Sequence, residues 1–243
     1  MLDVVTVTGA DDNTRPEELA SLAQKFPFVE FGILVGNHPG TPRYPSATWR
    51  DDLSDVAARN RSLHLSAHLC GRWVESFLTG DVWIADWFDR YQLNTHGQPH
   101  SFDIGVVRRN VRGSNHKGQQ VIFQYDGVNT NILLCCLGRH VTDRYSNLNV
   151  AALHDRSSGA GLLPPSWEKP LPGVYTGYAG GLSPDNVTGE LDKISALAGD
   201  LPFWIDAETH LRSEETGRYL DLDRVDRFLE AARPYVRSRG LET

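Results

Sequence analysis

Histidine and carboxylate side chains recur at every second position in two short segments of the 243-residue sequence. Because side chains alternate between the two faces of a strand, each set would share one face. Imidazole and carboxyl groups on one face can transfer protons or bind a polar substrate, so both segments are candidates for an active site. The residues are His64, Ser66 and His68 in the first segment and Asp206, Glu208 and His210 in the second.

Further polar residues lie where other short apolar runs end. Buried polar groups cost free energy unless they are paired. A barrel core would normally place Val, Ile and Leu at such positions, so this concentration predicts a pocket for a polar substrate. The residues are Thr8, Asp11, Asp12, Gln92, Asn94, Gln124, His154 and Asp155.

Two segments are candidates for binding an anion. In the first, Gly180 and Gly181 precede a helix start, with Ser183 as the expected cap and Pro184 in the first turn. Glycines let an anion approach the backbone, and a helix N-terminus supplies N–H donors and the positive end of a dipole. The second candidate is Arg43, which stands between two prolines in a loop. Both predict a phosphorylated or otherwise anionic ligand.

These residues must be positioned by an α/β framework, because short apolar runs alternate with helix-like stretches along the whole chain. Eight predicted strands in about 240 residues match the size of a (β/α)8 TIM barrel, and we expect residues 1–243 to form one such domain. An open doubly wound sheet is the alternative, but Thr8-Gly9-Ala10-Asp11 is not the expected glycine-rich phosphate loop. The predicted strands are 4–8, 28–35, 62–69, 90–94, 121–125, 148–153, 173–178 and 202–206.

Several helices and one long loop are predicted between the strands. Thr14 is the expected cap of the first helix, with Pro16 in its first turn. Residues 159–172 contain four prolines and predict a long loop on the active face. Arg108, Arg109, Arg112 and Lys117 lie in what we interpret as an insertion between the fourth and fifth strands. Further helices are expected over 47–60, 72–78 and 223–236, with the Cys135-Cys136 pair on a buried helix face.

Composition limits the classes of partner. The chain has 24 basic and 31 acidic residues and a formal charge of −7, which argues against nucleic-acid binding. No apolar stretch is long enough for a membrane span, and the N-terminus does not have the pattern of a signal peptide. Three cysteines give neither a disulfide framework nor a thiolate zinc site. We expect a cytoplasmic protein with a small phosphorylated substrate, no cofactor and no metal, and leave a homodimer open.

In this order along the chain, short motifs resemble those of phosphoribosylanthranilate isomerase, a (β/α)8 enzyme. The motifs are Val7-Thr8-Gly9, the segment from Gly32 to Ser46 with Pro42-Arg43-Tyr44, Gln92-Leu93-Asn94, Leu153-His154-Asp155 with Gly159-Ala160-Gly161, Gly180-Gly181-Leu182, and Ile205-Asp206. The resemblance implies an Amadori rearrangement of an aminoaldose phosphate. It further implies Asp155 as the general acid on the ring oxygen, Arg43 as a substrate-binding arginine, and Gly180 and Gly181 in the phosphate site.

Two departures from this family change the expected chemistry. Thr8 stands where the family has the cysteine that takes the proton from C2, and an unactivated hydroxyl is a poor general base. The last strand continues as Asp206 to Arg212 without the small Ser-Ser-Gly turn of the family's phosphate site. We therefore predict Asp155, Thr8, Asp11 and Glu208 as candidate catalytic residues. The predicted binding residues are Arg43, Gly180, Gly181, Asn94, His68 and Asp206.

Three other functions remain open at this point. His64, His68, Asp206, Glu208 and His210 offer ligands for a metal-dependent lyase or hydrolase, although His64 and His68 would lie about 13 Å apart along one strand. A non-catalytic small-molecule-binding protein is the second alternative. Glycosidase chemistry from paired carboxylates is the third, although no residue pair singles it out.

Overall fold

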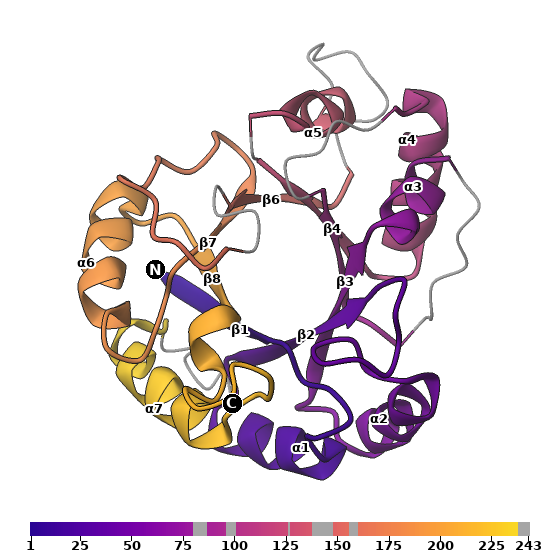
Figure 1. Ribbon diagram of the computed structural model, residues 1–243. Helices are drawn as coiled ribbons and strands as arrows, with labels where there is room; N and C mark the ends of the chain where they lie inside the picture. The colour runs from indigo at the N-terminus through magenta and orange to yellow at the C-terminus, as the bar shows by residue number, and fades with distance from the viewer. Residues whose placement is uncertain (80–86, 96–100, 126, 138–147, 156–159, 238–243) are drawn as a thin grey trace, which may run out of the picture.

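Eight parallel strands close into a barrel in the computed structural model, which describes residues 1–79, 87–95, 101–125, 127–137, 148–155 and 160–237. Each strand pairs with its neighbour in sequence, and β1 closes the ring against β8 (Figure 1). The prediction of a (β/α)8 barrel is confirmed. The strands are β1 (Leu2–Thr8), β2 (Val29–Val35), β3 (His64–Cys70), β4 (Arg90–Asn94), β5 (Gln120–Gln124), β6 (Val150–Asp155), β7 (Tyr175–Ala179) and β8 (Phe203–Ala207).

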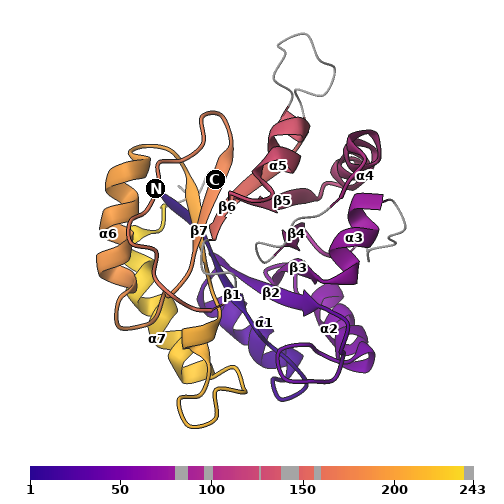
Figure 2. The same cartoon turned by 45° about the horizontal axis from the view of Figure 1, so that its top comes forward.

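Helices surround the barrel, with α6 and α7 on one flank and α3, α4 and α5 on the opposite flank (Figure 2). Residues 160–174, the described part of the connection from β6 to β7, contain no helix, as expected for the proline-rich loop. The α-helices are α1 (Pro16–Lys25), α2 (Ala47–Arg59), α3 (Arg72–Thr79), α4 (Ile104–His116), α5 (Thr130–Leu137), α6 (Val187–Ala198) and α7 (Leu222–Ala232). Two 3-10 turns, η1 (Thr209–Leu211) and η2 (Arg233–Tyr235), precede and follow α7.

Alternation along the strands separates an apolar outer face from a largely polar interior. The outward side chains, such as Val5, Phe31 and Ile33, are buried in one continuous core beneath the helices. Burial of this apolar surface supplies the main stabilisation of the fold. Only a small second cluster of buried apolar side chains lies inside the barrel, and Trp204 is its largest member.

A buried ion pair lies within the barrel on the side away from the strands' C-terminal ends. Arg90 Nε and Nη2 each lie 2.6 Å from the carboxylate of Glu30. The Thr6 hydroxyl donates to the same carboxylate, and the Arg90 guanidinium also faces the Trp204 ring at 4.8 Å. Each charge is therefore neutralised in place, as a buried ion requires. These contacts close the lower half of the interior and leave the hollow at the other end.

Three local expectations are wrong. The basic residues from Arg108 to Lys117 do not belong to an insertion, because they lie on and directly after α4, the regular helix between β4 and β5. Helix α1 is preceded by Arg15 rather than by Thr14, although Pro16 does occupy its first position. The C-terminal helix ends at Ala232, where the chain tightens into a 3-10 turn around Pro234.

Two further expectations on helices have clear outcomes. The Cys135-Cys136 pair lies on α5, where Cys136 is buried and Cys135 is partly exposed. Within the described part of the chain, no helix is both long and apolar enough to span a lipid bilayer.

Candidate active site

A hollow lies at the C-terminal ends of the strands. This is the end of a (β/α)8 barrel at which catalytic residues are found. Eleven residues of its wall come from β3 to β8 and the segment directly after β8, and four come from the loops that follow β6 and β7. The lining residues are His68, Gln92, Asn94, Gln124, Asp155, Gly161, Ala179, Gly180, Gly181, Leu182, Asp206, Ala207, Glu208, Thr209 and His210.

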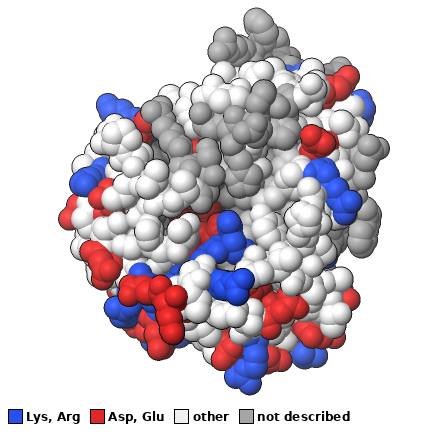
Figure 3. All heavy atoms as spheres, in the orientation of Figure 1, with Lys and Arg blue, Asp and Glu red and all other residues white. Residues whose placement is uncertain are grey.

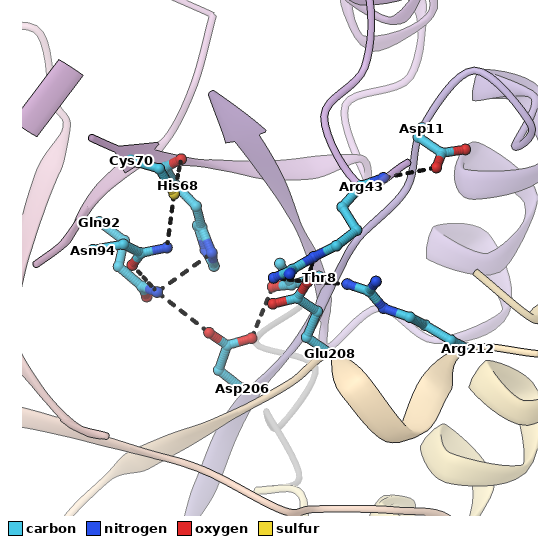
Figure 4. A network of polar contacts seen from close by, with 10 residues as sticks. All are labelled: Thr8, Asp11, Arg43, His68, Cys70, Gln92, Asn94, Asp206, Glu208 and Arg212. Carbon is cyan, nitrogen blue, oxygen red and sulfur yellow. Dashed lines mark hydrogen bonds and ion pairs between the residues drawn. The ribbon is translucent and has the colours of Figure 1, made fainter. Parts of the chain in front are cut away.

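Asp206 is a buried carboxyl group at the base of this hollow. The Thr8 hydroxyl donates to Asp206 Oδ1 at 2.8 Å, and Gln92 Nε2 donates to Oδ2 at 3.4 Å (Figure 4). Burial raises the pKa of Asp206 to about 7, and the nearby charges of Glu208 and Asp155 act in the same direction. The two hydrogen bonds oppose this shift without cancelling it. Asp206 can therefore gain or lose a proton near neutral pH, which suits a general acid or base.

Asp155 lies at the end of β6, at the same level of the barrel. The strand register pairs Asp155 with Ala179 on β7 and Ala179 with Asp206 on β8. Two strand spacings separate the backbones of Asp155 and Asp206 by about 10 Å, with only a methyl side chain between them. Gln124 Nε2 donates to Asp155 Oδ2 at 3.1 Å. Two carboxyl groups thus flank a gap that a small substrate can enter.

Gln124 is itself held in place by its neighbour on the loop after β4. Its Oε1 accepts from the Thr95 N–H at 2.7 Å and from the Thr95 hydroxyl at 3.0 Å. Both donors fix the orientation of the Gln124 amide, which leaves Nε2 directed at Asp155. The side chain of Asp155 is therefore positioned by its neighbouring strand rather than by solvent.

Arg43 and Arg212 share the carboxylate of Glu208 at one edge of the hollow. Arg43 Nε and Nη2 each lie 2.6 Å from Glu208 Oε1, and Arg212 Nη2 also donates to that oxygen (Figure 4). Burial lowers the pKa of Arg43, but the charge of Glu208 and its hydrogen bond, together with smaller effects of Tyr44 and Cys70, outweigh it, and the net shift is upward. The two guanidinium groups share the carboxylate of Glu208, with Asp11 as a second acidic neighbour, and Figure 3 shows basic atoms at the edge of the hollow. This edge suits an anionic group of a substrate.

The loop that carries Arg43 is strained and is fixed by Asp11. Arg43 has a φ of 79°, in the left-handed region that non-glycine residues rarely adopt. Its N–H donates to Asp11 Oδ2 at 2.9 Å, and the Asn13 N–H donates to Asp11 Oδ1 at 2.9 Å. Asp11 does not line the hollow. The structure therefore places this candidate catalytic residue where it positions the loop of Arg43.

Replacing Asp11 by alanine is expected to destabilise the fold by about 1–3 kcal/mol, because the part-buried hydrogen bonds from the N–H groups of Arg43 and Asn13 lose their charged acceptor. Urea denaturation measures this change. Asp11→Asn keeps one acceptor oxygen and should be the milder variant. Equal stability of the alanine variant and the unmodified chain would show that the loop does not depend on Asp11.

The glycine pair after β7 lies under the loop that follows β6. Gly180 and Gly181 have φ values of 113° and 67°. A Cβ on Gly181 would lie 2.3 Å from the backbone nitrogen of Leu163, so only glycine permits this close approach. The expected helix start at Ser183 is wrong, because α6 begins at Val187 and Asn186 bonds back to the Ser183 N–H. The Gly180-Gly181 backbone borders the hollow, but the helix N-terminus lies further along the chain.

Other predicted residues lie outside the hollow. His64 is at the opposite end of β3, where its Nδ1 lies 3.2 Å from the carboxylate of Asp89. His154 faces outward from β6 and stacks on Tyr178. No group of three His, Cys, Asp or Glu side chains placed to hold a metal occurs among the described residues.

Three residues of the site are absent from the predicted catalytic and binding residues, namely Gln92, Gln124 and Arg212, although the two glutamines are among the polar residues that predict the pocket. Gln92 lies two positions before the end of its predicted strand, and Gln124 lies one position before the end of its own. Their hydrogen bonds to Asp206 and Asp155 depend on strand register, which a single sequence does not give. Arg212 joins the site only because η1 folds the chain back over β8 after the strand ends.

Comparison with known proteins supports the fold. No family model and no curated protein sequence matches this chain. Among solved structures, a phospho-2-dehydro-3-deoxyheptonate aldolase (DAHP synthase) from Thermotoga maritima superposes with a TM-score of 0.54 and 12% identity, covering 96% of this chain and 69% of that chain. A fructose-bisphosphate aldolase from Campylobacter jejuni has a TM-score of 0.43 and 8% identity, over 95% of this chain and 86% of its own.

Proposed function

We propose that this chain is an acid/base isomerase of a small phosphorylated sugar-like metabolite, similar in reaction to phosphoribosylanthranilate isomerase. One observation carries the proposal: Asp206 is buried with a pKa of about 7 and accepts a hydrogen bond from Thr8, the residue at the family's cysteine position. The base that Thr8 cannot supply is thus available one hydrogen bond away. The T. maritima neighbour, named as a phospho-sugar-acid aldolase, is in keeping with this substrate class.

The two carboxyl groups have complementary roles in the proposed reaction. Asp155 gives a proton to the ring oxygen of the aminoaldose, and the C1–O bond breaks to leave an open-chain iminium ion. Asp206 then takes the proton from C2. The C–H electron pair forms the C1=C2 bond, and the C=N pair returns to nitrogen, which gives a neutral enolamine. Gain of a proton at C1 and loss of the O2 proton complete the ketose.

The ends of the hollow match the ends of such a substrate. The Gly180-Gly181 backbone borders the side near β7, where barrels commonly hold phosphate. Arg43, with Arg212 beside it, supplies positive charge on the side near β1 and β2 for a second polar or anionic group. Asn94 lines the wall between them. We propose the first as the phosphate side and the second as the side for the remainder of the substrate.

The direct test is consumption of phosphoribosylanthranilate at high enzyme concentration, with the surface variant Asp200→Asn as a matched control. Turnover that is equal in both proteins would support the isomerase function. Binding of the substrate, measured by calorimetry, without any turnover would instead favour the non-catalytic binding protein. Absence of both turnover and binding would contradict this substrate class.

Replacing Thr8 by cysteine is expected to keep turnover within about tenfold of the unmodified enzyme, because Asp206 and not residue 8 is the proposed base. A thiol is a weaker hydrogen-bond donor than a hydroxyl, so the pKa of Asp206 should rise and the activity should need a higher pH. Thr8→Ser keeps the donor and is the control. A gain above 100-fold in Thr8→Cys would show that the base is missing and that the cysteine restores it.

A further inference from the structure

The ring of His68 is fully buried within the barrel, yet one of its nitrogens has no partner. Among the residues that the structure describes, Nε2 makes no hydrogen bond. A Cβ on Gly32 would lie 2.7 Å from this nitrogen and 2.3 Å from Thr8 Oγ1, so both atoms pack closely against the same glycine. Native structures rarely leave a buried polar atom unpaired without a functional reason. His68 lines the hollow, so a ligand bound there is the candidate partner for Nε2.

A chain of hydrogen bonds determines which nitrogen of His68 carries the proton. Asn94 Nδ2 contacts Cys70 Sγ at 3.6 Å, which leaves Asn94 Oδ1 as an acceptor. Gln92 Nε2 donates to that oxygen at 2.9 Å, and it lies 3.3 Å from His68 Nδ1 (Figure 4). A flipped Gln92 amide would place its oxygen against Asn94 Oδ1 and Asp206 Oδ2, both of which accept. Gln92 has two amide hydrogens, so one donates to Asn94 Oδ1 and the other is shared between Asp206 Oδ2 and His68 Nδ1. Because Nδ1 faces this donor, it accepts, and the His68 proton is on Nε2.

The imidazole of His68 is also held in its neutral form. Burial lowers the pKa of His68 to about 3, and the charge of Arg90 acts in the same direction. The neutral ring keeps its proton at physiological pH. Such an imidazole donates a hydrogen bond to an oxygen that gains negative charge, without itself giving up a proton.

We propose that His68 is a catalytic electrophile: its Nε2–H donates to the substrate oxygen on the carbon that loses its proton to Asp206. The inference rests on the proposed function and assigns the oxygen-bearing carbon to the part of the hollow that His68 lines. Gln92 Nε2 lies 3.3 Å from His68 Nδ1 and 3.4 Å from Asp206 Oδ2, so one amide faces both groups. Gln92 is then a positioning residue that keeps the donor and the base at neighbouring places.

This arrangement also narrows the class of substrate. The donor is useful only if the carbon next to the iminium or carbonyl bears an oxygen, as in an aldose or an aminoaldose. A substrate without that oxygen leaves the Nε2–H unpaired in the complex, which costs binding free energy. The 2-deoxy analogue of the substrate should therefore bind more weakly, and a His68→Phe variant, which has no donor, should not discriminate between the two.

Nitrogen NMR of the 15N-histidine-labelled chain tests the state of His68 without any assay of activity. The resonance is assigned by its loss in His68→Gln. We expect a neutral ring with the proton on Nε2 across pH 5–8, and a mixture of the two tautomers in Gln92→Leu. Titration of His68 near 6.5, or a proton on Nδ1 in the unmodified chain, would overturn the proposal even if the enzyme is active.

Kinetics separate the catalytic role from a structural one. His68→Gln is expected to lower kcat by about 10²–10³-fold with little change in KM, because the donor acts on charge that develops during the reaction. Gln92→Leu should lower kcat less and Gln92→Glu should not restore it, since a carboxylate cannot donate to Nδ1. An active enzyme whose kcat is unchanged in His68→Gln would contradict the role of His68 and leave the isomerase function standing. An inactive unmodified enzyme would contradict the isomerase function, and with it this catalytic role, whatever the NMR result.

Discussion

Replacement of Asp206 by asparagine is expected to lower turnover of phosphoribosylanthranilate by about 10²–10⁴-fold, because the variant loses the group that takes the proton from C2. Asparagine has nearly the same shape and keeps an oxygen that can accept from Gln92. The Thr8 hydroxyl, which donates to Asp206 in the unmodified chain, can accept from the asparagine amide instead. The loss of rate would therefore report the missing base and not a rearranged site.

The pH dependence of activity in the unmodified enzyme is a second test of Asp206 as the general base. A general base acts in its ionised form, and burial raises the pKa of Asp206 to about 7. Activity should therefore rise as the pH passes through about 7. The rise should be absent from any residual activity of Asp206→Asn. A rate that is flat from pH 5 to 8 in the unmodified enzyme would mean that Asp206 is not the base.

Stability should move in the opposite direction to activity. A carboxyl group whose folded-state pKa lies above its unfolded value stabilises the fold at low pH, and that contribution is lost as the pH rises through the folded pKa. For Asp206 the loss falls between pH 4 and about 7. Asp206→Asn has no such loss, so its Tm should exceed that of the unmodified chain by a few degrees above pH 7 and by less near pH 4. Asp200→Asn, on the surface, serves as the control.

Much of the fold could be predicted from the sequence because its signals are local. The outward residues Val5, Phe31 and Ile33 follow a period of two in short runs, and these runs mark strands wherever they occur. The start of α6 could not be placed in the same way. Ser183-Pro184 has the usual cap pattern, but Asn186 bonds to the Ser183 N–H and delays the helix to Val187. Competing caps of similar strength are decided by contacts that the sequence does not show.

The sequence could predict that the candidate site lies at the strand ends, but it could not predict which of these side chains form hydrogen bonds with one another. Asp155 and Asp206 stand at the ends of predicted strands, and the hollow includes both. The bond from Thr8 to Asp206 joins residues 198 positions apart, and it exists only because β1 closes the barrel against β8. Long-range pairs of this kind set the pKa of Asp206, so the sequence alone suggested Thr8 and Glu208 as catalytic candidates and placed Asp206 among the binding residues.

Replacing Asp155 by asparagine is expected to lower turnover by about 10²–10⁴-fold, because the ring oxygen is no longer protonated as its bond to C1 breaks. This step is separate from the removal of the C2 proton by Asp206. Gln124 Nε2 still finds an oxygen acceptor in the variant, so the fold of the site should be retained. Calorimetry with the inactive protein checks this, since substrate affinity should stay near that of Asp206→Asn.

The direction in which the pH profile of activity shifts in Asp155→Asn distinguishes Asp155 from a residue that only binds substrate. The negative charge of Asp155 helps to raise the pKa of Asp206, so its removal should lower that pKa. The residual activity of Asp155→Asn should therefore begin to rise at a lower pH than that of the unmodified enzyme. An unshifted profile with a large loss of affinity would assign Asp155 to substrate binding. An upward shift would mean that the two carboxyl groups do not repel one another across Ala179, and the proposed division of acid and base between them would fail.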